Sequence, residues 1–373
     1  MSQRRSESVT FTVVVTVLVT LGALVMLAIL ALSGAPTVTL VAALLAALPV
    51  GPLVACYLWL DRYEPEPKRL LVYGLLWGAF VATAAAIVIG GIGGIFVPVT
   101  DHVSLAVVAP VSEEASKGLF LLLLLWWRRA ELDGILDGIV YAGMVGIGFA
   151  FTENVLYLAA AYNGTEGMGP GGLPDVTATF VLRCLVSPFA HPLFTAFTGI
   201  GIGIAVASRR RSVRVLAPLG GYALAVLAHG LWNGSTIFGA VGFAGVYVAL
   251  MLPALAGLVS LAVWARRSER VMLTAALTDA ARRQLIPSTD IGWVVDLRAR
   301  RAARAYALRQ GGPTAERAMA DYQQATIELG YLHSRLLRGT APADWQARGT
   351  EFVERIRAIR PYIAFPGQVV PTA

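Results

Sequence analysis

Long apolar runs separated by short polar breaks dominate the first 265 residues of the chain. A helix needs about 20 mostly apolar residues to cross the hydrocarbon layer of a membrane. Runs of this kind occur at residues 10–32, 38–60, 69–97, 103–127, 135–162, 178–207, 213–238 and 240–265. The pattern predicts an all-α, polytopic membrane protein with about eight transmembrane helices. The first run is longer than the roughly 7–15-residue apolar core of a secretory signal, so we expect it to be retained as a helix.

The basic residues alternate between the two ends of these helices. They gather at Arg4 and Arg5, at Arg62, Lys68 and Arg69, at Arg128 and Arg129, at Arg209, Arg210, Arg211 and Arg214, and at Arg266 and Arg267. The intervening loops, around residues 33–36, 98–101, 162–177 and 238–239, contain no Lys or Arg. Because cytoplasmic loops carry an excess of both residues, we expect both termini in the cytoplasm. The Gly-rich segment 163–174 would then face the outer side of the cell membrane.

Residues 268–373 differ from the rest of the chain. They are rich in Arg, Ala and Glu, and helical periodicity is interrupted at Pro287, at Gly311-Gly312-Pro313 and at Pro342. We therefore expect a transmembrane bundle at 1–267, with its candidate functional motifs within 50–240, and a cytoplasmic tail of three or four amphipathic helices at 268–373. A cationic tail could rest on anionic lipid, although a solvated helical hairpin is the simpler interpretation.

Composition excludes several other classes of protein. Hydrophobic residues make up 57% of the chain and Asp, Glu, Lys and Arg only 14%, with a mean hydropathy of +0.67, which is too apolar for a soluble, disordered or collagen-like chain. The formal net charge of +7 does not indicate nucleic-acid binding, because the positive-inside rule already accounts for the Arg residues. Cys56 and Cys184 both lie in apolar runs and support neither a disulfide framework nor a thiolate metal site.

Six ionisable residues lie well inside the predicted spans, where such groups are costly and usually functional. They are Glu113, Glu114, Lys117, Glu153, His191 and His229. Counted from the outer ends of their helices at about 1.5 Å per residue, the acids and imidazoles lie roughly 14–18 Å deep. The acids and imidazoles of the runs 103–127, 135–162, 178–207 and 213–238 would therefore lie at one level in the outer half of the bilayer. Asp137 and Arg183 sit nearer helix ends, from which they can reach an interface.

Spacing along the helices brings several of these residues onto common faces. Lys117 follows Glu113 by four residues and Glu114 by three, so either acid can meet the ammonium, and His229 and Asn233 are also four apart. Each feature has a plain structural explanation, because intramembrane ion pairs can be structural and a lone histidine is usually a hydrogen-bonded packing residue. Together, however, three acids, two histidines and an asparagine supply a general base, metal ligands and an oxyanion donor.

At these residues the sequence resembles the PrsW family of intramembrane proteases, within a wider group that includes CAAX prenyl proteases and bacteriocin-processing membrane enzymes. The motifs are Glu113-Glu114-Ala115-Ser116-Lys117 for EExxK, Phe149-Ala150-Phe151-Thr152-Glu153 for FxxxE, Ser187-Pro188-Phe189-Ala190-His191-Pro192 for the third motif, and His229 with Asn233 for HxxxN. Residues 61–67 also resemble the family's loop between helices two and three. The motifs are weak singly and specific as a set, and they span about residues 50–240. Prenyl proteases have FxxxH in place of FxxxE, so Glu153 makes the sequence more similar to the PrsW family than to the prenyl proteases.

The resemblance implies hydrolysis of a peptide bond in a single-span membrane protein. Members of the family are implicated in the first cut of membrane-anchored anti-sigma factors. The residue types suit a divalent metal, most simply Zn²⁺, held by His191, His229 and a carboxylate from Glu153 or Glu113. Zinc with such ligands and an open position lowers the pKa of its water to about 7.

The other polar residues receive roles from the same chemistry. Glu114 would be the general base that takes the proton of water and returns it to the leaving amine. Lys117 would orient the two acids and keep them ionised, and Asn233 would donate to the oxyanion. Which glutamate has which role stays open. A metal-free mechanism also stays open, in which Glu114 activates water while His229 and Asn233 hold the oxyanion.

Two other classes of function use similar residues. A proton- or cation-coupled transporter could use the same buried Glu, Lys and His set, but such proteins more often show inverted repeats and interrupted helices in both halves, and the sequence shows neither. A lipid- or prenyl-modifying enzyme would need a phosphate-binding cluster, and none is evident. The substrate, the cut site and the oligomeric state are not encoded in these patterns.

Overall fold

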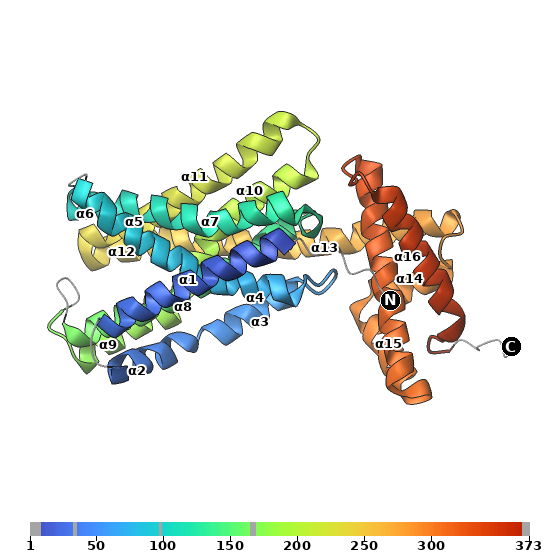
Figure 1. Cartoon of the computed structure of the whole chain (residues 1–373), viewed down its shortest axis with the longest axis horizontal. Helices are drawn as coiled ribbons and strands as arrows, with labels where there is room; N and C mark the ends of the chain where they lie inside the picture. The colour runs from blue at the N-terminus through green and yellow to red at the C-terminus, as the bar shows by residue number, and fades with distance from the viewer. Residues whose placement is uncertain (1–8, 33–35, 97–98, 165–168, 368–373) are drawn as a thin grey trace. The chain divides into compact units, whose positions relative to one another are not determined.

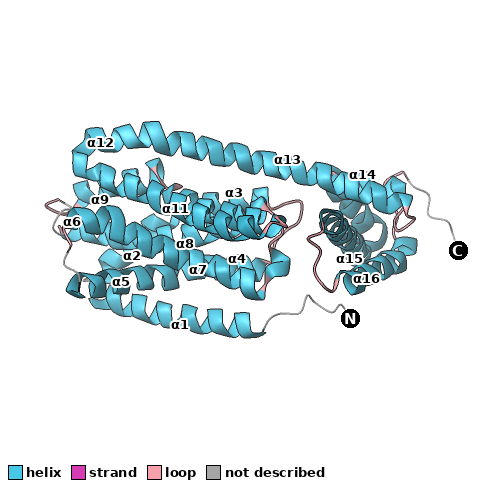
Figure 2. Ribbon diagram, turned by 90° about the horizontal axis from the view of Figure 1, so that it is seen from above, coloured by secondary structure: helices cyan, strands magenta, loops and turns pink. Residues whose placement is uncertain are grey.

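The computed structural model describes residues 9–32, 36–96, 99–164 and 169–367, and every regular element within them is a helix (Figure 2). Arg4 and Arg5, residues 33–35, Pro98 and residues 165–168 of the expected outer loop lie outside the described residues. The chain divides into two compact units. Unit 1 comprises Met1–Asp61 and Glu66–Ala262, and unit 2 comprises Arg62–Pro65 and Val263–Ala373.

Unit 1 is a bundle whose helices run roughly side by side (Figure 1). Its elements are α1 (Val9–Leu32), α2 (Pro36–Ala47), α3 (Val50–Leu60), α4 (Lys68–Leu76), η1 (Trp77–Ala82), α5 (Thr83–Phe96), α6 (Asp101–Val103), η2 (Ser104–Val108), α7 (Ala109–Trp127), η3 (Arg129–Glu131), α8 (Ile135–Asn163), α9 (Leu173–Phe180), η4 (Val181–Val186), α10 (Ala190–Ala207), α11 (Arg211–Ser235), η5 (Thr236–Phe238), α12 (Gly239–Val246), η6 (Tyr247–Met251) and the first part of α13 (Leu252–Arg282). Proline accounts for two interruptions within expected runs, because Pro49 lies between α2 and α3 and Pro188 lies between η4 and α10.

Six helices among the described residues are long and apolar enough to cross a membrane. They are Val9–Ala31, Pro36–Leu60, Lys68–Ile92, Ile135–Asn163, Leu173–Ala207 and Arg211–Arg282. The last contains two of the expected spans, which are separated at Gly239, where φ is 67°. The expected span 103–127 is helical but carries three charged residues in its middle, so its composition alone does not mark it as apolar. The chain is thus an all-α, multi-pass membrane protein, while the count of eight spans stays a prediction.

Helix α8 lies at the centre of unit 1 and is buried along most of its length. It packs against α10, η1, α2, α4 and α3. Glycines permit the closest approaches to α10. A Cβ atom on Gly138 would lie 2.1 Å from the carbonyl oxygen of Gly199, and one on Gly146 would lie 2.6 Å from Cα of Pro192. The second of these contacts fixes the beginning of α10, which carries His191.

Unit 2 consists of the end of α13 followed by η7 (Ser288–Asp290), α14 (Ile291–Val295), α15 (Leu297–Arg338), α16 (Trp345–Ile359) and η8 (Arg360–Tyr362). The expected helical character of residues 268–373 is confirmed for the described residues. Helix α15 is kinked at Gly311 and Gly312, where φ reaches 68° at the second glycine. Asp290 is fully buried and accepts hydrogen bonds from Tyr322 and Arg360. The boundary at residue 267 and the cytoplasmic side of the tail stay predictions.

Candidate active site

Helices α7, α8, α10 and α11 bring the six ionisable residues predicted inside the spans into a single buried cluster. Lys117 of α7 is at its centre and has no exposed surface. Its Nζ donates to Oε1 of Glu114 at 2.8 Å and to Oε2 of Glu113 at 3.3 Å. The same ammonium lies 3.1 Å from Nδ1 of His191 and 3.7 Å from the ring centroid of Phe149. Lys117 therefore links both acids of α7 to the imidazole of α10.

Glu114 is fully buried, and both of its oxygens are occupied. Oε1 accepts from Lys117 and from Nδ1 of His229, at 2.8 and 3.0 Å, and Oε2 accepts from the hydroxyl of Thr195 at 3.1 Å. Because a carboxylate only accepts, Nδ1 of His229 carries a proton. Glu114 thus orients the His229 ring, which also stacks on Phe194 with centroids 4.7 Å apart.

Glu153 of α8 has one occupied oxygen and one open oxygen. Its Oε2 lies 2.5 Å from Nε2 of His191 and also pairs with the guanidinium of Arg183. Since the ammonium of Lys117 can only donate to Nδ1 of His191, the proton of that neutral imidazole is on Nε2 and points to Glu153. No group within the described ranges donates to Oε1 of Glu153.

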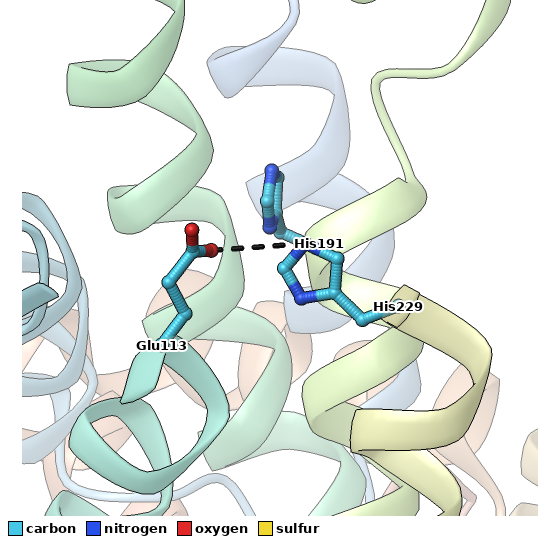
Figure 3. A group of neighbouring side chains, drawn as sticks. All are labelled: Glu113, His191 and His229. Atoms are coloured by element: carbon cyan, nitrogen blue, oxygen red, sulfur yellow. Dashed lines mark ion pairs between the residues drawn. The ribbon is translucent and has the colours of Figure 1, made fainter. Parts of the chain in front are cut away.

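Glu113, His191 and His229 form a group that could hold a metal ion. Each offers one ligand atom, and these atoms lie within 4.8 Å of one another. Figure 3 shows the three side chains approaching one another, with Oε2 of Glu113 3.7 Å from Nε2 of His229. Glu114 holds the other nitrogen of His229, as carboxylates commonly do behind metal-bound histidines.

Charge also bears on whether a cation fits this group. With neutral imidazoles, the three carboxylates of the cluster face two cationic side chains, Lys117 and Arg183. The buried cluster then has a net negative charge, and an uncompensated charge is costly away from water. A bound cation or a proton would offset it. The negative charge favours a cation, and the donor types and their spacing fit a divalent metal.

A cavity of about 480 Å³ adjoins the cluster. Glu153 and His191 lie on its wall, and Asn233, Arg183 and Trp232 also line it. Such a volume is in the usual range for small-molecule sites, and for a peptide it would take a few residues. The cavity therefore exposes Glu153 and His191 of the cluster to a bound molecule.

The structure leaves one of the predicted site residues outside the ionised network and adds two residues that the sequence did not indicate. Asn233 lines the cavity, but its Nδ2 donates to the backbone carbonyl of Leu105 at 3.2 Å, so it stands apart from the ionised network. Arg183, for which the sequence suggested only contact with an interface, lies beside Glu153. An arginine within an apolar run was a signal that could have indicated this. Thr195, which binds Glu114, gave no signal, because a threonine on an apolar helix is common.

Comparison with known proteins agrees with this geometry. The model of the PrsW family of intramembrane metalloproteases matches residues 66–258, a stretch that contains every residue of the cluster. Protease PrsW of Geobacillus kaustophilus (strain HTA426) is 30% identical over 174 residues, which cover 43% of this chain and 66% of that protein. No solved structure matches the chain. Because the family model covers more than half of the sequence, the chain belongs to the PrsW family.

Proposed function

We propose that the chain is an intramembrane peptidase that hydrolyses a peptide bond of a single-span membrane protein. The observation that carries this proposal is the buried group of Glu113, His191 and His229 beside a cavity that His191 and Glu153 line. Family membership supports the reaction class. The network supplies what hydrolysis requires: an open carboxylate oxygen, buried cations and a site for a metal ion.

Zinc is the metal that we propose for the site, with Glu113, His191 and His229 as its ligands. Binding would require the ammonium of Lys117 to move away from Nδ1 of His191, because that nitrogen carries the lone pair of the ring. Bound there, zinc would act as a Lewis acid that makes water a stronger acid. Of the two carboxylates left open by the sequence, we favour Glu113 as the ligand. Each glutamate has one oxygen held by neighbours and one without a hydrogen-bond donor among the described side chains. The choice rests on the spacing of Glu113, His191 and His229, whose ligand atoms all lie within 4.8 Å of one another.

Glu153 is the residue that we propose as the general base. Its open Oε1 lies on a side chain that lines the cavity, so it can take a proton from water there. The resulting hydroxide attacks the peptide carbonyl, and the protonated Glu153 then delivers the proton to the leaving amine. General bases of this kind contribute about 10²–10⁴-fold to rate.

Glu114 then has a different role from the one that its motif suggests. Its oxygens already accept three hydrogen bonds, so it has little capacity to take a proton from water. We propose that it positions Lys117 and His229. Asn233 stays the proposed oxyanion donor, because its bond to Leu105 uses one of its two amide protons and the residue lines the cavity.

The substrate and location follow from the family and the charge pattern, and both belong to the proposal. A membrane-anchored anti-sigma factor is the substrate class that the resemblance implies. From the positive-inside pattern we propose that the protein lies in the cell membrane, with both termini in the cytoplasm and the cluster in the outer half of the bilayer.

The test compares cleavage with metal content in the same purified samples. A single-span reporter in liposomes is incubated with the wild type, Glu153→Gln or Glu113→Gln. We expect both variants to lose at least about a hundredfold in cleavage rate. Only Glu113→Gln should also lose bound metal, because it removes a ligand.

Glu131→Gln is the matched control, since Glu131 is buried but pairs with Arg128 outside the cluster. It should keep both cleavage and metal. Wild-type turnover by Glu153→Gln would contradict the base assignment. An active wild type without metal, and indifferent to chelators, would contradict the zinc proposal and leave the glutamate mechanism standing.

A further inference from the structure

Arg183 is the only Lys or Arg, among the described residues, on the wall of the cavity. It lies in η4 and is anchored to three residues of α8. Nη2 pairs with Oε2 of Glu153, Nε donates to Oδ1 of Asn154 at 2.8 Å, and the guanidinium lies 3.9 Å from the ring centroid of Tyr157. These contacts fix the plane of the guanidinium.

One end of this guanidinium is not used by the protein. No group in the described part of the chain accepts a hydrogen bond from Nη1 of Arg183, and the side chain is 21% exposed. A guanidinium has five N–H donors in a rigid fork. With Nε and Nη2 held by α8, the N–H groups of Nη1 are available to a molecule in the cavity.

A peptide in a membrane-embedded cavity has a need that this donor can meet. A transmembrane substrate must unwind before its backbone can be hydrolysed, and unwinding frees carbonyl groups from their helical hydrogen bonds. Each unsatisfied backbone group costs several kcal/mol away from water. A donor next to the reacting carboxylate would therefore stabilise the unwound segment where it must be cut.

We propose that Nη1 of Arg183 binds a backbone carbonyl oxygen of the unwound substrate next to the scissile bond. This inference rests on the proposed peptidase function. A neutral carbonyl fits better than an acidic side chain, because Glu153 already balances the charge of Arg183. A second carboxylate would add an uncompensated buried charge. Arg183 thus positions substrate without selecting for side-chain charge.

The test separates substrate binding from support of Glu153. Arg183→Lys keeps a cation beside Glu153, but a single nitrogen cannot reproduce the fork. We expect kcat to stay within a few-fold of the wild type, while KM for the liposome reporter rises about tenfold or more, as expected for a lost hydrogen bond from a charged donor. The rise should be equal for reporters with Asp or Asn beside the cut.

Arg183→Ala allows a second test, in which an added small molecule replaces the missing guanidinium. Millimolar guanidinium should restore part of its lost cleavage, and urea, the neutral molecule of similar shape, should not. Arg128→Lys is the matched control, since Arg128 also pairs with a buried glutamate but does not line the cavity.

Each outcome has a defined meaning. An unchanged KM in Arg183→Lys, or no rescue by guanidinium, would overturn the inference while leaving the peptidase function intact. A larger rise in KM for the Asp reporter than for the Asn reporter in Arg183→Lys would overturn it too, because Arg183 would then bind an acidic side chain and not the backbone. Absence of cleavage by the wild type would instead refute the proposed function itself.

Discussion

Removing the charge of Lys117 should strongly destabilise the protein, and removing a partner charge at the same time should restore part of the loss. Lys117 has no exposed surface and contacts two carboxylates at 2.8 and 3.3 Å. Lys117→Met keeps the length of the side chain but leaves Glu113 and Glu114 buried together without their cation. Breaking a buried pair in this way costs about 3–5 kcal/mol.

The double variant Lys117→Met/Glu114→Gln should be more stable than the sum of the two single changes implies. Neutralising Glu114 removes one of the two carboxylates that Lys117→Met leaves unpaired. Coupling between residues in contact is typically about 0.5–3 kcal/mol, and the short contact with Glu114 predicts a value near the upper end. Cleavage should be lost in all three variants.

The assay is reversible unfolding in detergent micelles, followed by helical circular dichroism, with cleavage measured on the same samples. Arg348→Met is the control, since Arg348 pairs with Asp344 at the i,i+4 spacing of Lys117 and Glu113 but at a more exposed site. Exposed pairs contribute about 0.2–1 kcal/mol at most. Strict additivity in the double variant, or a Lys117→Met protein as stable as the wild type, would refute the buried network.

Three further predictions concern packing, metal and topology. Gly146→Ala should lower cleavage at least tenfold by pushing the beginning of α10 away from α8. Gly220→Ala should have no such effect, because a Cβ atom there would meet nothing within 4 Å. Equal cleavage by the two variants would contradict the close approach of α8 and α10. Removal of metal by a chelator should lower both cleavage and the unfolding temperature, because a ligand bound only to the folded state stabilises it, and zinc should restore both; unchanged values would argue against a metal. Single cysteines at Leu173 and Ser288, in a cysteine-free background, should react with an impermeant thiol reagent from opposite sides of the membrane; labelling from one side would mean that the topology is wrong.

The helices were predictable because the membrane imposes a simple length requirement on apolar runs. All eight expected runs are mainly helical over their described residues, with breaks at Pro49 and Pro188. Their subdivision was less predictable, since a turn at Gly239 joins two runs through a short 3₁₀ segment and yields one continuous helical stretch, Arg211–Arg282. The convergence of the cluster was predictable because depth along straight helices is simple arithmetic.

The roles within the cluster were not predictable from sequence. Both glutamates of the first motif can reach Lys117 by spacing alone, but only the packing of α10 and α11 decides which one meets Thr195 and His229. Which carboxylate keeps an open oxygen depends on side-chain partners from other helices, such as Arg183 beside Glu153. Spacing along one helix contains no information about these partners.

The central claim is that this cluster hydrolyses a peptide bond within the membrane. The most direct measurement incubates the purified wild-type protein with a single-span reporter in liposomes made in H₂¹⁸O, and analyses the products by mass spectrometry. We expect two fragments, with one ¹⁸O in the newly formed C-terminal carboxylate, and no fragments with Glu153→Gln. An intact reporter, together with a proton or cation flux that Glu153→Gln abolishes, would contradict hydrolysis and indicate a transporter.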